Sequence, residues 1–239
     1  MLREIIKKIP VLYTCALRIK HWIWRTQTRK KLTEYLKTNM MPKLQLGAGT
    51  NVLSGWFNTD YFARPTVFFL DVTKKFPFTD NLFELIFSEH HIEHISYKDA
   101  QNMLAESFRV MKQGGYIKII TPNLQQYIHC YANDEVYTPI IKQHTEDWVY
   151  SGFDKAINYI PVDDHYKAHF INDIFLNYEH KFIYDAQALK TLIKKAGFIN
   201  INVIGLPSVS HRDFEGIETH RSKFDLIFNL TIEAQKPLN

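Results

Sequence analysis

Two closely spaced glycines are the first residues of this sequence whose type and spacing could do chemistry. Gly47-Ala48-Gly49 follows the apolar segment 43–46, in a chain that has only 9 glycines among 239 residues. Glycine has no Cβ atom, so a turn built from it lets the backbone approach a ligand closely. The pair alone is equally consistent with a tight structural turn.

Carboxylates follow the next apolar segments at regular intervals. Asp60 comes after the segment 56–59, and Asp71-Val72 comes after 66–70. Ser88 and Glu89 end a fourth apolar segment. A carboxylate at the end of the second strand of an open α/β sheet can accept hydrogen bonds from both hydroxyl groups of a ribose. The glycine turn and Asp60 therefore indicate a nucleoside site.

Histidines cluster directly after the fourth apolar segment. His90-His91-Ile92-Glu93-His94 matches the H-x-x-E-H pattern of inverted zinc proteases. On a helix, His90 and His94 would share a face and could bind Zn²⁺. However, the residues before them have the pattern of a buried strand, so we expect no tightly bound metal. The alternative is that Glu93 and His94 form local hydrogen bonds at the start of the next helix.

The periodicity of the chain predicts the elements that position these residues. Strands are expected at 43–46, 56–59, 66–70, 85–88, 116–120, 199–204 and 226–234, and helices at 97–111 and 185–196. Gln113-Gly114-Gly115 is expected to end the first of these helices and turn the chain. Such alternation predicts an α/β fold with a mostly parallel sheet and helices on both faces. The two last strands, with no obvious helix between them, suggest an antiparallel hairpin at one edge.

These segments, in this order, resemble the class I S-adenosylmethionine (SAM) dependent methyltransferases, in particular their small-molecule and glycan-associated branch. The resemblance covers residues 43–123 and, more loosely, 182–236. It is carried by the glycine turn, the strand-end carboxylates, the segment PFTDNLFELIFSEH at 77–90, and Gln113-Gly114-Gly115 before the next strand. It implies a seven-stranded Rossmann-like sheet with SAM across the carboxyl ends of the first four strands.

The resemblance also implies a role for individual residues. Gly47, Ala48 and Gly49 would pass the methionine part of SAM, and Asp60 would bind the ribose hydroxyls with Tyr61 beside it. Asp71 and Val72 would border the adenine. Ser88 and Glu89 would face the methionine end and the methyl acceptor.

Two departures from the usual pattern stand out. About a dozen residues separate the glycine turn from Asp60, so the first crossover helix must shrink to a turn or so. Asn51 and Val52 replace a continuing glycine-rich run, which disfavours the G-x-G-x-x-G dinucleotide fingerprint.

The expected reaction is methyl transfer from SAM to a hydroxyl or amine of a small or sugar-containing acceptor, with polysaccharide biosynthesis as the suggested setting. A hydroxyl acceptor would benefit from a general base. Candidates are His91, His90 and Glu89, with the cluster 163–165 behind them. The second hypothesis is a non-catalytic, Rossmann-like SAM-binding or scaffold module. The third is a metallohydrolase that uses the H-x-x-E-H segment.

Charge separates residues 1–41 from the domain expected at 42–239. The first segment carries a net charge of +8 and the remainder −4, which argues against a nucleic-acid surface spread over the domain. Two short helices broken near Pro10 are expected there. They would either pack on the domain or lie on an anionic membrane through Trp22, Trp24 and the basic residues.

The chain lacks the pattern of a signal peptide or a membrane span, and two cysteines do not make a disulfide framework. We therefore expect a cytoplasmic protein, with peripheral contact at the inner face of a membrane as an option. Residues 124–180 have no clean period and are expected to be an insertion that covers the substrate. The sequence leaves the oligomeric state open.

Overall fold

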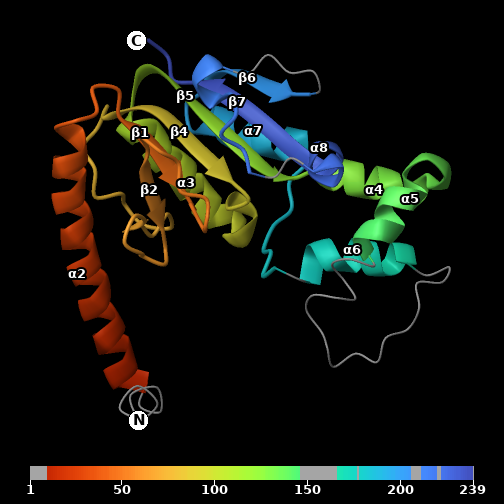
Figure 1. The fold of residues 1–239 in the computed structure, drawn as a ribbon, viewed down its shortest axis with the longest axis horizontal. Helices are drawn as coiled ribbons and strands as arrows, with labels where there is room; N and C mark the ends of the chain where they lie inside the picture. Colours follow the sequence, from red (N-terminus) through yellow and green to blue (C-terminus); the bar gives the residue numbers. More distant parts are fainter. Residues whose placement is uncertain (1–9, 146–165, 177, 206–210, 220–221, 239) are drawn as a thin grey trace.

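A seven-stranded sheet forms the centre of the protein (Figure 1). The computed structural model describes residues 10–145, 166–176, 178–205, 211–219 and 222–238. The strand order is β3-β2-β1-β4-β5-β7-β6. The strands are β1 (Lys43–Leu46), β2 (Phe57–Asp60), β3 (Phe68–Phe69), β4 (Phe83–Glu89), β5 (Met111–Pro122), β6 (Ile199–Ile204) and β7 (Asn229–Gln235).

The sheet is parallel except for its last strand in the chain. Strands β1 to β5 pair in parallel with their neighbours, whereas β7 runs antiparallel to both β5 and β6. This confirms the predicted mostly parallel sheet with an antiparallel edge hairpin. In a sheet of this order the carboxyl ends of β1, β2 and β4 meet at one edge, which is where ligands bind in open α/β folds.

Strand β5 begins earlier than predicted. Helix α3 (Tyr97–Val110) ends before Met111, and Gly114 and Gly115 lie inside the strand. A Cβ atom at Gly115 would lie 2.6 Å from the Glu84 carbonyl oxygen, at the place where the β4–β5 register shifts. The glycines therefore allow a β-bulge here, not the turn that their spacing suggested.

Helices α3 and α7 (Ala186–Lys195) cover one face of the sheet. Each begins at a side-chain cap: Ser96 accepts from the backbone N–H of Asp99, and Asp185 accepts from that of Ala188. Their buried residues join one apolar core that includes Leu104, Leu189 and Ile86. The opposite face is covered near β4 by the short helix η3 (Arg212–Phe214) and by loops.

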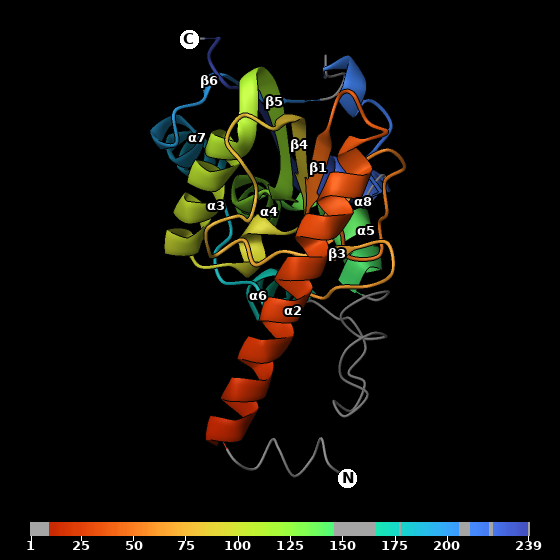
Figure 2. The ribbon, with the colours of Figure 1, turned by 90° about the vertical axis from the view of Figure 1, so that its left-hand side faces the viewer.

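Helix α2 (Pro10–Leu36) is one continuous helix that lies along the β2–β3 edge (Figure 2). Leu32 is buried there, and the Thr28 hydroxyl donates to the carbonyl oxygen of Phe69 over 3.0 Å. The N-terminal half runs past the sheet in both views. Two helices were expected here, with a break near Pro10. The residues of the first one, before Pro10, lie outside the described part of the chain. Among those described, no helix is long and apolar enough to cross a membrane.

Turns alone connect β1 to β2, so the predicted shortening of the first crossover helix to a turn or so is confirmed. The expected insertion carries helices α4 (Leu124–Ala132), α5 (Asp134–His144) and α6 (Tyr166–Leu176). These pack with α8 (Lys223–Phe228) into a second apolar cluster around Phe170. The predicted strand 226–234 begins only at Asn229, so its predicted start was wrong. Residues 226–228 belong to helix α8, which begins at a capping box formed by Ser222 and Asp225.

Candidate active site at the carboxyl ends of β1, β2 and β4

The glycine turn after β1 is shaped by a histidine that follows β4. Gly47 and Gly49 both have positive φ, +67° and +49°. A Cβ atom at Gly47 would lie 2.3 Å from Cγ of His91, whereas a Cβ at Gly49 would have nothing within 4 Å. Gly47 therefore makes room for the His91 ring, and only Gly49 borders the open space expected for a ligand.

Backbone amides orient the Asp60 carboxylate at the end of β2. The N–H groups of Gly49 and Phe62 donate to its two oxygens over 2.9 and 2.8 Å. A carboxylate oxygen has two lone pairs, so each retains capacity for one more donor. Tyr61 is next to it and is 41% exposed. The structure thus brings Asp60 beside the glycine turn, as the spacing predicted.

The loop after β3 carries Asp71 and Val72. One Asp71 oxygen accepts from the backbone N–H and the hydroxyl of Thr73, over 3.0 and 2.7 Å. The Val72 side chain is buried in the main core. Its carbonyl oxygen accepts from the Asn102 side chain of α3 over 3.1 Å.

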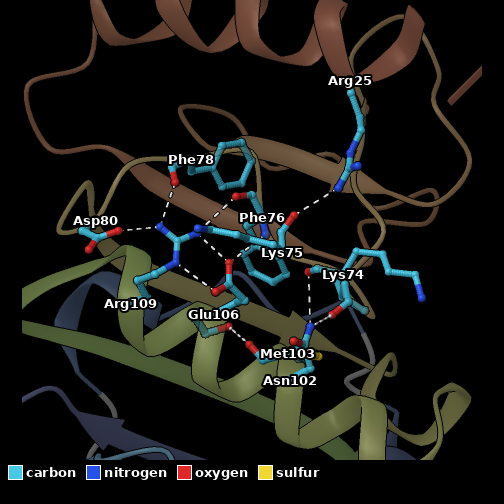
Figure 3. A network of polar contacts seen from close by, with 12 residues as sticks. Arg25, Lys74, Lys75, Phe76, Phe78, Asp80, Asn102, Met103, Glu106 and Arg109 are labelled. Carbon is cyan, nitrogen blue, oxygen red and sulfur yellow. Dashed lines mark hydrogen bonds and ion pairs between the residues drawn. The ribbon is translucent and has the colours of Figure 1, made fainter. Parts of the chain in front are cut away.

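Helix α3 anchors the rest of this loop through three polar residues (Figure 3). Asn102 also donates to the Lys74 carbonyl, and Glu106 accepts from the Phe76 N–H over 2.7 Å. The Arg109 guanidinium donates to the carbonyls of Phe76 and Phe78 and to Glu106. Sequence reasoning did not find these residues. Their spacing, four and then three positions on one helix face, was the available signal.

Ser88 and Glu89 end β4 in different surroundings. Ser88 is fully buried, and its hydroxyl has no hydrogen-bond partner in the described part of the chain. The Glu89 carboxylate accepts from the backbone N–H and hydroxyl of Thr219 and from the Asn51 side chain. Glu89 therefore ties two loops together, although the resemblance implied that it would face the acceptor.

His90 and His91 lie on opposite sides of the segment that leaves β4. The His91 ring packs on Gly47, and its Nε2 atom is buried without a partner among the described residues. Burial lowers the pKa of His91, and the nearby Asp60 and Glu93 carboxylates offset this only in part. His90 has a positive φ of 46°, and its Nδ1 lies 3.1 Å from Oε1 of Glu93.

A cavity of about 370 Å³ lies between this segment and the insertion, and we name it the insertion pocket. It is within the size range of small-molecule sites. Three of its residues, His144, Asp173 and His180, were not found from the sequence, because they come from irregular or weakly patterned segments. The cluster 163–165 lies outside the described residues. The pocket is lined by His90, Glu93, His94, Pro122, Tyr127, His144, Asp173, Ile174, Tyr178, His180, Ser222, Phe224 and Asp225.

The H-x-x-E-H segment does not form the helix that an inverted zinc-protease site needs. Only Ile92–His94 is helical, as the 3₁₀ turn η1, and the positive φ of His90 breaks any longer helix. Glu93 is fully buried and accepts from the Thr121 hydroxyl over 3.0 Å. Burial raises the pKa of Glu93, but the hydrogen bond and charge of His90, with smaller effects of a backbone hydrogen bond and of His94, together make the net shift downward. Ser96, not Glu93, caps α3.

Comparison with known families supports a methyltransferase assignment for the middle of the chain. Residues 56–119, from the start of β2 into β5, match a family model described as a methyltransferase domain. This match supports the SAM-dependent methyltransferase activity that the sequence predicts. The cofactor of this enzyme class is SAM, and the open space at Gly49, the oriented Asp60 carboxylate and the unpartnered buried atoms of Ser88 and His91 fit a polar ligand at this edge.

No curated protein sequence matches this methyltransferase. Among solved structures, it is similar to a SAM-dependent methyltransferase from Archaeoglobus fulgidus, with 14% identity and a TM-score of 0.46 over 89% of this chain and 94% of that one. It is also similar to the CurJ carbon methyltransferase, with 12% identity and a TM-score of 0.45 over 82% of this chain. It spans 48% of the length of that second chain.

Proposed function

We propose that this methyltransferase transfers the methyl group of SAM to a hydroxyl or amine of a small or sugar-containing acceptor bound in the insertion pocket. One observation carries the proposal. Two consecutive residues contact the two places: His90 lines the pocket, and His91 packs on Gly47 at the glycine turn. A donor at the turn and an acceptor in the pocket would therefore meet at this segment.

The donor site would use the residues that the sequence singled out. Gly49, Ala48 and Gly47 would pass the methionine part, Asp60 would accept from the ribose hydroxyls, and Tyr61 would flank them. Asp71 and Val72 would border the adenine, and the buried Ser88 hydroxyl would face the methionine end. Bound SAM supplies a methyl group that its sulfonium already activates. The protein then has to align the acceptor and exclude water.

The lining of the insertion pocket supports a polar acceptor with some apolar surface. The wall of the pocket combines aromatic side chains, among them Tyr127 and Phe224, with the carboxylates of Asp173 and Asp225. A sugar has both kinds of surface, so an acceptor from polysaccharide biosynthesis suits the pocket. Of the three base candidates, His90 is the one that lines the pocket, whereas Glu89 is engaged by Thr219.

Product formation with a panel of sugars, phenols and amines tests this proposal. S-adenosylhomocysteine should accumulate only when an acceptor is present. The variant His90→Ala should slow turnover by about 10²–10⁴-fold, the usual contribution of a general base, without changing the affinity for S-adenosylhomocysteine. The matched control is His129→Ala, which removes an exposed histidine of α4. Full turnover of His90→Ala at saturating acceptor would rule out this role.

A further inference from the structure

We propose that Glu93, His94 and His180 bind one divalent transition-metal ion of the zinc class in the wall of the insertion pocket. Each of the three offers a ligand atom, and these atoms all lie within 4.8 Å of one another. Two histidines and one glutamate form a known catalytic zinc ligand set, one that leaves a fourth position open.

Hydrogen bonds to the backbone prepare both histidines as ligands. Nδ1 of His180 lies 2.6 Å from the carbonyl oxygen of Ile174, which can only accept, so this nitrogen carries the hydrogen and Nε2 keeps its lone pair. His94 also forms a hydrogen bond to the backbone of Tyr178. The two ring centroids are 4.8 Å apart. Metal-binding histidines usually donate their second ring N–H to a carbonyl or carboxylate, which fixes the ring.

The buried carboxylate of Glu93 would be the anionic ligand of this site. Its side chain is fully buried, and its hydrogen bonds come from Thr121 and His90. Within the described ranges, no lysine or arginine forms an ion pair with it. A buried carboxylate is costly unless a cation or a full set of donors compensates it. A divalent ion between Glu93 and the two rings would add to the stabilisation that His90 and Thr121 already give.

The geometry requires only small adjustments. Ligand atoms around one tetrahedral zinc lie roughly 3.3 Å apart when the metal–nitrogen bonds are about 2.0–2.1 Å. The ligand atoms lie within 4.8 Å of one another, so binding one ion would draw the three side chains closer together. All three residues line the insertion pocket, so the fourth position faces the cavity. If the proposed function holds, an acceptor oxygen could occupy that position and be oriented there, and the metal would make its proton easier to remove.

This site differs from the one suggested by the H-x-x-E-H pattern. His90 is turned to Glu93 as a hydrogen-bond partner, and the second imidazole comes from His180, far along the chain. The sequence alone could not join His180 to Glu93, so it did not suggest this combination of ligands.

Metal titration of the purified full-length protein tests the proposal without using activity. After treatment with a chelator, Co²⁺ added as the chloride should bind at one equivalent with the intense visible absorption of a four-coordinate site, and Zn²⁺ should displace it. His180→Ala and His94→Ala should each weaken binding by about 100-fold or more, since even residues that only support a ligand contribute 10–100-fold. His129→Ala should bind like the wild type. Absence of one-equivalent binding, or unchanged binding by His180→Ala, would overturn the proposal.

A second experiment uses only the wild-type protein, so it tests the metal site even if a histidine variant does not fold. Diethyl pyrocarbonate modifies accessible imidazoles, and mass spectrometry locates each modified histidine. Zn²⁺ should protect His94 and His180 while His129 reacts at the same rate with and without the metal. Equal modification of His180 in both samples would contradict the site. Because neither experiment involves SAM or an acceptor, their outcome is separate from that of the proposed function.

Discussion

At the scale of single residues, the two glycines of the turn do different work. Gly47 leaves space that the His91 ring fills, and Gly49 borders open space. Both positions have a positive φ, which alanine adopts at a cost. The spacing Gly-x-Gly therefore reflects one packing contact, at Gly47, and one turn residue beside open space, at Gly49. Substituting each glycine in turn should distinguish the two roles.

Gly47→Ala should destabilise the protein by about 2–5 kcal/mol, the combined cost of a left-handed alanine and of overpacking against His91. Gly49→Ala should lose only about 1–2 kcal/mol, from the backbone alone. Urea unfolding measures both values. The double variant Gly47→Ala/His91→Ala should recover part of the loss. Equal losses for Gly47→Ala and Gly49→Ala would contradict the assigned contact.

At the scale of elements, one helix controls the loop that follows β3. The polar face of α3 holds the backbone of residues 72–78 through Asn102, Glu106 and Arg109 (Figure 3). The pairing with Glu106 and Asp80 raises the pKa of Arg109 further, so the guanidinium stays charged at any accessible pH. The order of this loop near Asp71 therefore depends on α3 as well as on the contacts of Asp71 with Thr73.

Asn102→Ala should loosen the start of this loop and weaken SAM binding by about 3–10-fold, because two backbone carbonyls lose a donor worth roughly 0.5–1.5 kcal/mol each. Calorimetry with SAM and hydrogen exchange of residues 72–76 measure the two effects. Lys98→Ala, on an exposed position of the same helix, is the matched control. An affinity equal to that of the control would show that α3 does not influence the adenine side.

Much of the fold could be predicted from the sequence because apolar runs and turns are local signals. The strands 43–46 and 199–204 were placed as observed, and the short β1–β2 connection followed from residue counting. The bulge at Gly115 and the start of α8 were missed, since they depend on β4 pairing and on a capping box. Likewise Asp60 was placed by spacing, whereas His180 and Asn102 reach their positions only through tertiary packing.

At the scale of the whole molecule, the N-terminal segment differs from the rest of the chain in its charge, and part of its helix runs past the sheet. Residues 1–41 carry a net charge of +8 against −4 for the rest. The N-terminal half of α2 runs past the sheet, and Trp22 is 69% exposed near the exposed Arg25 and Arg29 (Figure 2). We propose that this part of the helix contacts an anionic lipid surface.

The full-length protein should co-sediment with anionic vesicles at low salt and less so at high salt, because screening weakens charge attraction. Trp22→Ser with Ile23→Ser should reduce this binding while Thr28, Leu32 and Tyr35 keep α2 on the domain. Neutral vesicles and the exposed substitution Thr33→Ser serve as controls. Binding to neither vesicle type would leave α2 as a packing element only.

The central claim is that one nucleoside site joins the glycine turn to the end of β2, and calorimetric titration with SAM and S-adenosylhomocysteine tests it most directly. The account predicts one site per chain, competition between the two ligands, and an affinity that falls by about 1.5–3 kcal/mol in Asp60→Ala, the scale of charge-assisted hydrogen bonds. No heat of binding in the wild type, or an unchanged affinity in a folded Asp60→Ala variant, would contradict it.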